Sequence, residues 1–98
     1  MSLHPIEFEW DDEKAKINLR RHNGVSFEEA ETVFGDPFAH ILDDPDHTLD
    51  KERAIIIGYS QKHRLLFVSF AARGNVIRII SARQADLPER EIYEEKYD

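Results

Sequence analysis

The sequence predicts an α+β fold with the element order β-α-α-β-β-β-β-α: a mostly antiparallel sheet with two N-terminal helices on one face and a short C-terminal helix. Three apolar runs of strand length follow one another in the second half of the chain, Ala54–Tyr59, Leu65–Ala72 and Val76–Ala82. They are rich in β-branched and aromatic residues and are separated by short polar turns, which is typical of an antiparallel meander. Two helical patterns precede them without alternating with strands, which favours α+β over α/β.

Length and composition indicate one globular domain over residues 1–98. With 41% hydrophobic and 34% charged residues, the chain can form a core and does not have the composition of a disordered segment. The absence of cysteine excludes disulfides and thiolate metal sites. No apolar run approaches the roughly 20 residues that cross a bilayer, so we expect a cytoplasmic protein without membrane contact.

The chain opens with a predicted strand and a predicted helix. Ile6, Phe8 and Trp10 alternate with glutamates, which indicates a short strand with one buried face. A helix is then expected from Asp11 or Asp12 to about His22, because acidic residues lie at its start and basic residues at its end.

This first helix carries a polar stripe. Its members share one side of the cylinder: Lys14, Asn18, Arg21 and His22. The stripe is either a solvated face or one wall of a groove beside the sheet.

A second helix is predicted after Ser26, which forms a capping box with Glu29. It ends at Gly35-Asp36-Pro37, and Phe38–Leu42 follows as a further strand. The acidic segment Asp43–His47, with His40 nearby, contains residue types that bind metals, but its spacing matches no established metal motif. We interpret it as a turn and expect no metal or other cofactor.

Arginine marks the predicted meander. The residues from 51 to 84 carry seven Lys or Arg and one Glu, a net of +6, while the whole chain carries −7, so the remaining residues carry −13. Such a contrast suggests a site for an anion such as RNA phosphate. The alternative is that the arginines are solvated or pair with the surplus carboxylates.

The alternation of residues predicts how the strands face. Leu65–Ala72 is apolar on both sides, which indicates a central strand. In the last strand Ile77 and Ile79 would share a face with Arg83, and Arg78 would point the other way, so that the arginines would line a groove near strand ends. A final helix is expected from Leu87 to Lys96, capped by Asp86 with Glu89 at its third position.

Several residues are candidates for RNA chemistry. Cleavage through the 2′-hydroxyl needs a base, an acid and cations, and arginine suits phosphate through its planar fork. The candidate catalytic residues are Arg83, Arg64, Glu52, Arg53, His22 and His47. The candidate RNA-binding residues are Lys14, Arg73, Arg78 and Tyr93. Histidine needs little tuning near neutral pH, whereas Glu52 is as readily an ion-pairing residue as a base, and Tyr93 either stacks on a base or packs the last helix.

The chain resembles the BrnT family of toxins in several motifs. These are Phe8-Glu9-Trp10-Asp11 with Lys14 and Asn18, Arg21–Ala30 with Val33-Phe34, Glu52-Arg53, Ile57-Gly58 and Arg78–Arg83. The resemblance spans about residues 8–93. Two departures from the family pattern are an extra Asn23 and the strong acidity.

The resemblance implies a RelE-like fold and a bacterial type II toxin that cleaves RNA without a metal and inhibits translation. It also implies a BrnA-like antitoxin with a ribbon-helix-helix domain, a toxin–antitoxin hetero-oligomer, and DNA contact only through that antitoxin. A non-catalytic or degenerate binding module that pairs with the antitoxin in operon repression is the alternative.

Overall fold

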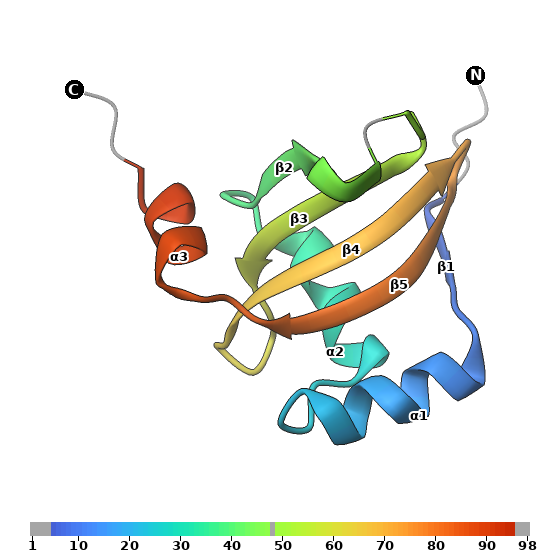
Figure 1. Ribbon diagram of the computed structural model, residues 1–98, viewed down its shortest axis with the longest axis horizontal. Coiled ribbons are helices and arrows are strands. Elements are labelled where there is room, and N and C mark those ends of the chain that lie inside the picture. Colours follow the sequence, from blue (N-terminus) through green and yellow to red (C-terminus); the bar gives the residue numbers. More distant parts are fainter. Residues whose placement is uncertain (1–4, 48, 96–98) are drawn as a thin grey trace.

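The computed structural model describes residues 5–47 and 49–95, which form five strands, three α-helices and two short 3₁₀ turns (Figure 1). In chain order they are β1 (Glu7–Glu9), α1 (Asp12–Arg21), α2 (Phe27–Thr32), a 3₁₀ turn (Val33–Gly35), β2 (His40–Asp43), a 3₁₀ turn (Pro45–His47), β3 (Arg53–Tyr59), β4 (Leu65–Arg73), β5 (Val76–Gln84) and α3 (Leu87–Tyr93). The predicted order of helices and strands is confirmed.

The strands form one sheet in the order β1-β5-β4-β3-β2. Strands β2 to β5 pair antiparallel, and only β1 runs parallel to its neighbour, β5. In Figure 1, α2 lies behind the sheet, α1 lies below β5, and α3 lies to the left of the sheet. The predicted mixed, mostly antiparallel sheet is therefore confirmed.

The sheet separates two apolar clusters. On the α2 side, Val25 and Phe27 pack with Leu66 and Val68 of β4. On the other side, α3 covers a smaller cluster around Ile57. Since β4 contributes to both clusters, the prediction of a central strand covered on both faces is confirmed. The burial of apolar side chains on each face of the sheet holds α2 on one side and α3 on the other.

A β-bulge in β5 corrects the predicted facing of the arginines. Ser69 pairs with Ser81, but the next residue of β4, Phe70, pairs with Ile79, so that Ile80 is an extra residue in β5. An extra residue reverses the alternation of side chains beyond it. Arg83 therefore shares a face with Arg78 and not with Ile79, contrary to the sequence prediction.

Two helix caps differ from each other. The Ser26 hydroxyl accepts the backbone N–H of Glu29, as predicted, but the Glu29 carboxylate turns away from the helix end, so the capping box is only half formed. A complete capping box occurs at Asp86 and Glu89. The helix that follows ends at Tyr93; the predicted end at Lys96 lies outside the described residues.

Asn18 fixes α1 against the edge of β5 that β1 leaves open. Its side-chain amide donates to the carbonyls of Ala82 (2.7 Å) and Val25 (3.0 Å) and accepts the N–H of Ala82 (3.0 Å). A single side chain thus satisfies backbone groups that a neighbouring strand would otherwise pair. This buried member of the predicted polar stripe has a structural role.

Gly58→Ala is expected to lower the free energy of unfolding by roughly 1–3 kcal/mol. A Cβ at this position of β3 would lie 2.9 Å from the Cβ of Ala39 and 3.0 Å from Cγ1 of Val33, and neither can retreat easily from the core. Urea unfolding measures the change. Gly35→Ala is the matched control, because no atom lies within 4 Å of its added methyl group; equal stability of the two variants would contradict the packing argument.

Candidate active site

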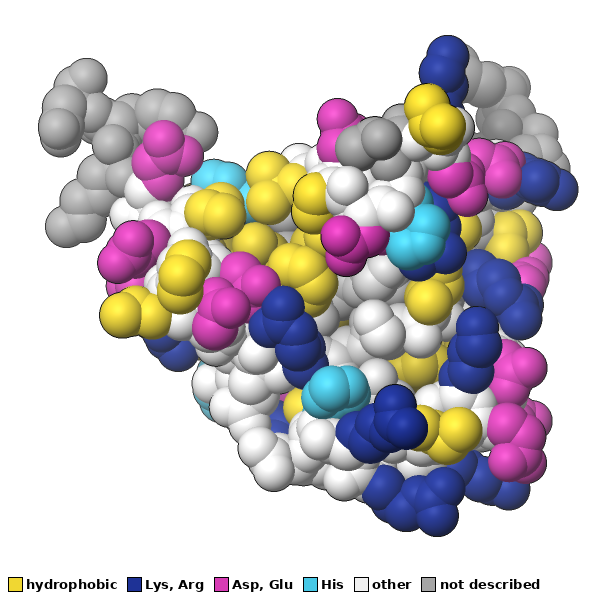
Figure 2. Space-filling view, viewed as in Figure 1, with side chains coloured by type: hydrophobic (Ala, Val, Ile, Leu, Met, Phe, Trp, Pro, Cys, Tyr) yellow, Lys and Arg dark blue, Asp and Glu magenta, His cyan; other side chains and the backbone are white. Residues whose placement is uncertain are grey.

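One face of the sheet, here called the arginine face, carries four of the five meander arginines. Arg53 lies opposite Ala71, and Ala71 lies opposite Arg78, so these residues share a face. Arg73 is two residues beyond Ala71, and Arg83 pairs with Phe67 on the same side. Figure 2 views this face: basic side chains gather along the right and lower margins, and the middle is hollowed.

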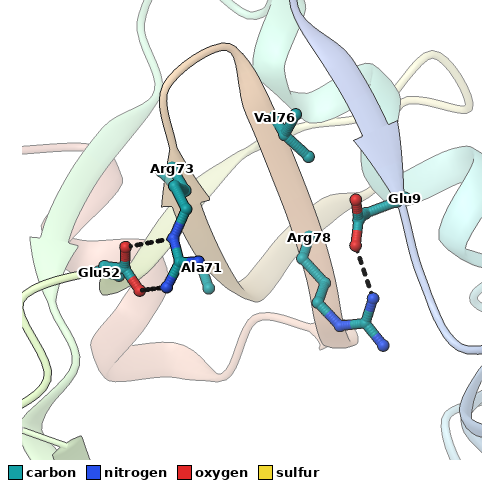
Figure 3. A pocket seen from close by; sticks show the side chains of 7 residues that line it. Glu9, Glu52, Ala71, Arg73, Val76 and Arg78 are labelled. Atoms are coloured by element: carbon teal, nitrogen blue, oxygen red, sulfur yellow. Dashed lines mark hydrogen bonds and ion pairs between the residues drawn. The ribbon is translucent and has the colours of Figure 1, made fainter.

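Two arginines at the β4–β5 hairpin are neutralised by glutamates (Figure 3). Arg73 binds Glu52 through Nε and Nη2 at 2.8 and 3.0 Å, and Arg78 binds Glu9 at 2.6 Å. These four side chains line a cavity of about 390 Å³. Hydrogen bonding from Arg73 lowers the pKa of Glu52, which weakens this carboxylate as a general base.

Arg83 is held by the last helix. Both of its Nη atoms lie 2.7 Å from the Glu89 carboxylate, and its guanidinium carbon lies 4.1 Å from the ring centre of Phe67. The hydrogen bonds to Glu89 raise the pKa of Arg83. Its charge is thus permanent, but its fork is occupied by a carboxylate of the protein itself.

Arg53 differs from the other arginines of this face. Its Nη2 lies 3.6 Å from Oδ2 of Asp44, too far for a hydrogen bond, and its Nε is buried without a hydrogen-bond partner among the described residues. No side-chain hydrogen bond of Arg53 is formed among the described residues, and its side chain is 21% exposed, so the exposed part of the guanidinium is free to bind an anionic ligand.

The same aspartate orients a histidine. Nδ1 of His47 lies 3.2 Å from Oδ2 of Asp44, whose side chain is 7% exposed, while the imidazole is 46% exposed. This arrangement fixes the ring and leaves its other nitrogen accessible. His47, Asp44 and Arg53 line one cavity of about 210 Å³ together with Asp43, Asp50 and Lys51; we call it the His47 pocket.

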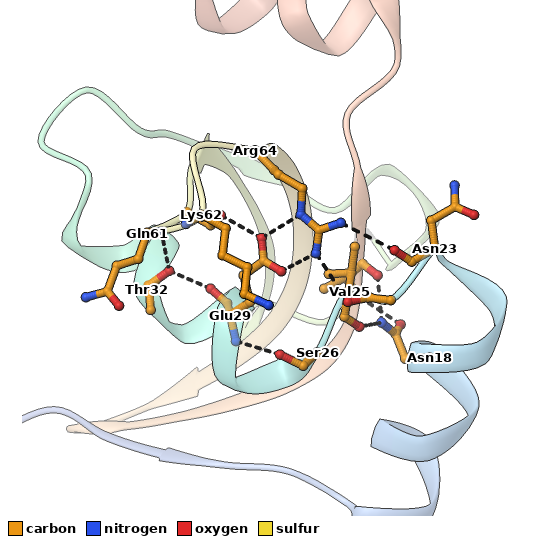
Figure 4. Close-up of polar contacts among 12 residues, drawn as sticks. Asn18, Asn23, Val25, Ser26, Glu29, Thr32, Gln61, Lys62 and Arg64 are labelled. Atoms are coloured by element: carbon orange, nitrogen blue, oxygen red, sulfur yellow. Dashed lines mark hydrogen bonds and ion pairs between the residues drawn. The ribbon is translucent and has the colours of Figure 1, made fainter.

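Arg64 lies apart from this set, on the α2 side of the sheet (Figure 4). Its Nε donates to Oε2 of Glu29 at 2.9 Å, its Nη2 binds Oε1 of the same carboxylate, and it also reaches the carbonyls of Asn23 and Gly24. Ser60 donates to Glu29 as well, at 2.6 Å. This network joins α2 to the β3–β4 turn.

The polar stripe of α1 does line a groove beside the sheet. Lys14, Arg21 and His22 enclose a cavity of about 170 Å³ with Ile80 and Ser81 of β5. We call it the α1 pocket. It contains the second histidine candidate, whereas His47 lies beyond β3, at least two strands away. The two histidines therefore line separate cavities.

Tyr93 packs α3 onto the sheet. Its hydroxyl donates to Oδ2 of Asp36 at 2.7 Å, and its ring meets that of Tyr59 edge to face at a centroid distance of 5.2 Å. Burial and the Asp36 carboxylate raise the pKa of Tyr93 to about 12. These contacts show the packing role that the sequence left open.

The structure thus brings together only part of the predicted site. His47 and Arg53 share a pocket, His22 and Lys14 share another, Glu52 and two arginines share a third, and Arg64 lies on the opposite face. Sequence reasoning missed the orienting role of Asp44; its spacing of three residues from His47 is the signal that could have found it. Within residues 5–47 and 49–95, no three His, Asp or Glu side chains are arranged to hold a metal.

The fold and this face define a small α+β protein with clustered cations and a histidine–aspartate pair, suited to an anionic substrate. Residues 10–89 match the family described as the ribonuclease toxin, BrnT, of type II toxin–antitoxin systems. The chain therefore belongs to the BrnT family of ribonuclease toxins, and this class of system implies an antitoxin partner.

A solved structure agrees in fold. The crystal structure of the Brucella abortus ribonuclease toxin BrnT, at 1.1 Å resolution, aligns with a TM-score of 0.64 and 23% identity over 83% of this chain and 97% of that chain. Comparison with curated proteins gives no match. No helix in the described part of the chain has both the length and the apolar character to cross a membrane.

Proposed function

We propose that this toxin cleaves RNA without a metal ion, at the His47 pocket. The observation that carries the proposal is the combination of an oriented imidazole with a partly exposed guanidinium that makes no hydrogen bond among the described residues. Such cleavage requires a base, an acid and a cation that can bind the phosphate. Each of the other three candidate arginines of this face forms an ion pair with a glutamate.

The proposed reaction transfers the phosphate to the neighbouring 2′-oxygen. His47 takes the proton of the 2′-hydroxyl, whose oxygen attacks phosphorus. Arg53 stabilises the extra negative charge of the pentavalent phosphorane. The bond to the 5′-oxygen then breaks, and Lys51, which lines the same pocket, gives that oxygen a proton. The products are a 2′,3′-cyclic phosphate and a 5′-hydroxyl.

Cleavage of RNA by the purified protein in EDTA tests this function. We expect new ends that carry 2′,3′-cyclic phosphate, and no cleavage where the scissile nucleotide is 2′-deoxy, because the nucleophile is then missing. The assay uses free RNA and ribosome-bound RNA in parallel. Cleavage that requires added metal, or that leaves a 3′-hydroxyl, would show the proposed mechanism to be wrong.

The finer description of the system is also a proposal. We propose that the toxin inhibits translation in the cytoplasm and is neutralised by a BrnA-like ribbon-helix-helix antitoxin, through which alone the complex contacts DNA. The resemblance of motifs such as Arg78–Arg83 to the family supports this reading. Co-purification with the product of the adjacent reading frame is the direct test of the pairing.

A second candidate function is a non-catalytic module that binds the antitoxin and acts in operon repression. Two observations favour it. Arg73, Arg78 and Arg83 form ion pairs with glutamates of the same chain, and the net charge of −7 opposes RNA binding. Tight antitoxin binding with no cleavage of either RNA substrate would support this function over the first.

A further inference from the structure

We infer that the α1 pocket is a second subsite for the RNA backbone, which holds a phosphate of the substrate strand outside the cleavage pocket. The inference rests on the proposed ribonuclease function for the identity of the ligand. It assigns a role to Arg21 and Ser81, and it gives Lys14 and His22 a role in binding.

The cations of this pocket are available, unlike three of the four arginines of the arginine face. Three arginines of the arginine face lie 2.6–2.8 Å from a glutamate oxygen. The side chains of Lys14 and Arg21 make no ion pair or hydrogen bond within the described ranges, and no Asp or Glu lines their pocket. A polyanion meets no internal competitor there.

The pocket is already formed without a ligand. Asn18 lies between Lys14 and Arg21 on the same side of α1, and its three hydrogen bonds fix that side of the helix against β5. The cations are therefore presented on a rigid element, and less freedom is lost on binding than at a mobile loop.

The α1 pocket also adjoins the arginine face. Ser81 lines the pocket and pairs with Ser69 across the arginine face, and Arg83 is two residues further along β5 on that face. Ser69, in turn, lies opposite Ile55 of β3, two residues from Arg53. Ser69 and Ile55 are themselves buried, so an RNA strand seated in the α1 pocket would have to pass over this row to continue towards the His47 pocket.

A nucleic-acid backbone fits these observations better than an acidic protein segment does. Its phosphates recur at regular intervals, so one strand can occupy both pockets. An antitoxin segment that binds here instead is an outcome that the experiment below distinguishes.

The test compares two doubly substituted proteins by their affinity for a 2′-O-methyl RNA 12-mer, which cannot be cleaved through the 2′-hydroxyl. Lys14→Ala/Arg21→Ala removes the pocket cations. Lys16→Ala/Arg20→Ala removes two cations of the same helix that do not line this pocket. Both changes lower the net charge from −7 to −9, so a difference between the two proteins reports position and not total charge.

We expect the pocket variant to bind the 12-mer roughly tenfold more weakly than the control variant. Its plot of log affinity against log salt should be shallower by about 0.7, the value for one lost phosphate contact on a single strand. Equal affinity of the two proteins would overturn the inference, as would loss of antitoxin binding with RNA binding retained. The proposed cleavage site is tested by a different assay, the rate of RNA cleavage. If that site is wrong, a His47 variant will cleave RNA as fast as the wild type does.

Discussion

His47→Asn is expected to lower the rate of RNA cleavage in EDTA by about a hundredfold or more, the usual contribution of a general acid or base. Asparagine can still donate a hydrogen bond towards the buried Asp44 carboxylate, which lies 3.2 Å from the imidazole Nδ1. The substitution therefore removes proton transfer with little loss of local order. Cleavage rates are measured under single-turnover conditions, with the thermal unfolding midpoint as the check on folding.

His63→Asn is the matched control for that experiment. His63 is exposed in the β3–β4 turn and has a φ of 61°, a conformation that asparagine tolerates well. Its variant should cleave RNA at the wild-type rate. If His47→Asn also cleaves at that rate while His22→Asn does not, then the catalytic centre is in the α1 pocket and our assignment is wrong.

Substitutions of Asp44 and Arg53 are expected to lower the cleavage rate as well, but by a smaller factor. Asp44→Asn keeps the shape of the side chain but removes the charge that both His47 and Arg53 approach. Arg53→Lys keeps the charge and removes the planar fork. Both should lower the cleavage rate by less than His47→Asn does, because each leaves the imidazole in place.

The sequence predicted the order of elements because each one has a local cause. The Ser26 and Asp86 caps, the alternation around Phe8 and the apolar runs of the meander act within a few residues. Local patterns of this kind agree with the tertiary structure in a well-folded chain. Only the exact ends, such as that of α3 at Tyr93, depend on packing that the pattern does not contain.

The facing of the arginines could not be predicted from the sequence. In residues 76–82 of β5, apolar residues occur in both alternate sets of positions, and each set also contains one polar residue, Arg78 or Ser81, so the pattern does not reveal the extra residue, Ile80. One such residue transfers Arg83 to the arginine face. The sequence thus predicted that the arginines line a groove near strand ends, whereas the structure has four of them on one face of the sheet.

Ion-pair partners were equally hidden, because they are far apart in the chain. Glu9 pairs with Arg78 across 69 residues, and Glu29 pairs with Arg64 across 35. Composition shows that surplus carboxylates exist but not where they lie. The structure confirms the alternative that strand-end arginines pair with them, and it leaves Arg53 as the arginine of that face whose buried Nε has no partner within the described residues.

Glu29→Gln is expected to lower the free energy of unfolding by roughly 2 kcal/mol at pH 7, because it removes the buried counter-ion of the partly exposed Arg64 and weakens their charged hydrogen bonds. The two side chains are 2% and 25% exposed, and Ser60 completes the network. Urea unfolding at pH 7 measures the loss. Glu28→Gln is the control, since Glu28 is the exposed neighbour of Glu29 in the first turn of α2, and it should change stability little.

The pH dependence of this difference separates the ion pair from mere packing. Hydrogen bonds from Arg64, and then from Ser60, hold the pKa of Glu29 below its usual value of 4.5. A carboxyl group whose pKa is lowered by folding stabilises the protein above its unfolded pKa, and this stabilisation is lost as pH falls through the folded pKa. The gap between wild type and Glu29→Gln should therefore be full above about pH 4.5 and shrink below it.

The same variant decides whether the Glu29–Arg64 pair has a part in catalysis. The pair lies on the α2 side of the sheet, whereas the proposed cleavage site lies beside the arginine face. Folded Glu29→Gln protein should therefore cleave RNA at the wild-type rate in spite of its lower stability. A difference in stability between wild type and Glu29→Gln that stays constant down to pH 3 would contradict the ion-pair argument. Loss of cleavage by the fully folded variant would show that Arg64 belongs to the active site.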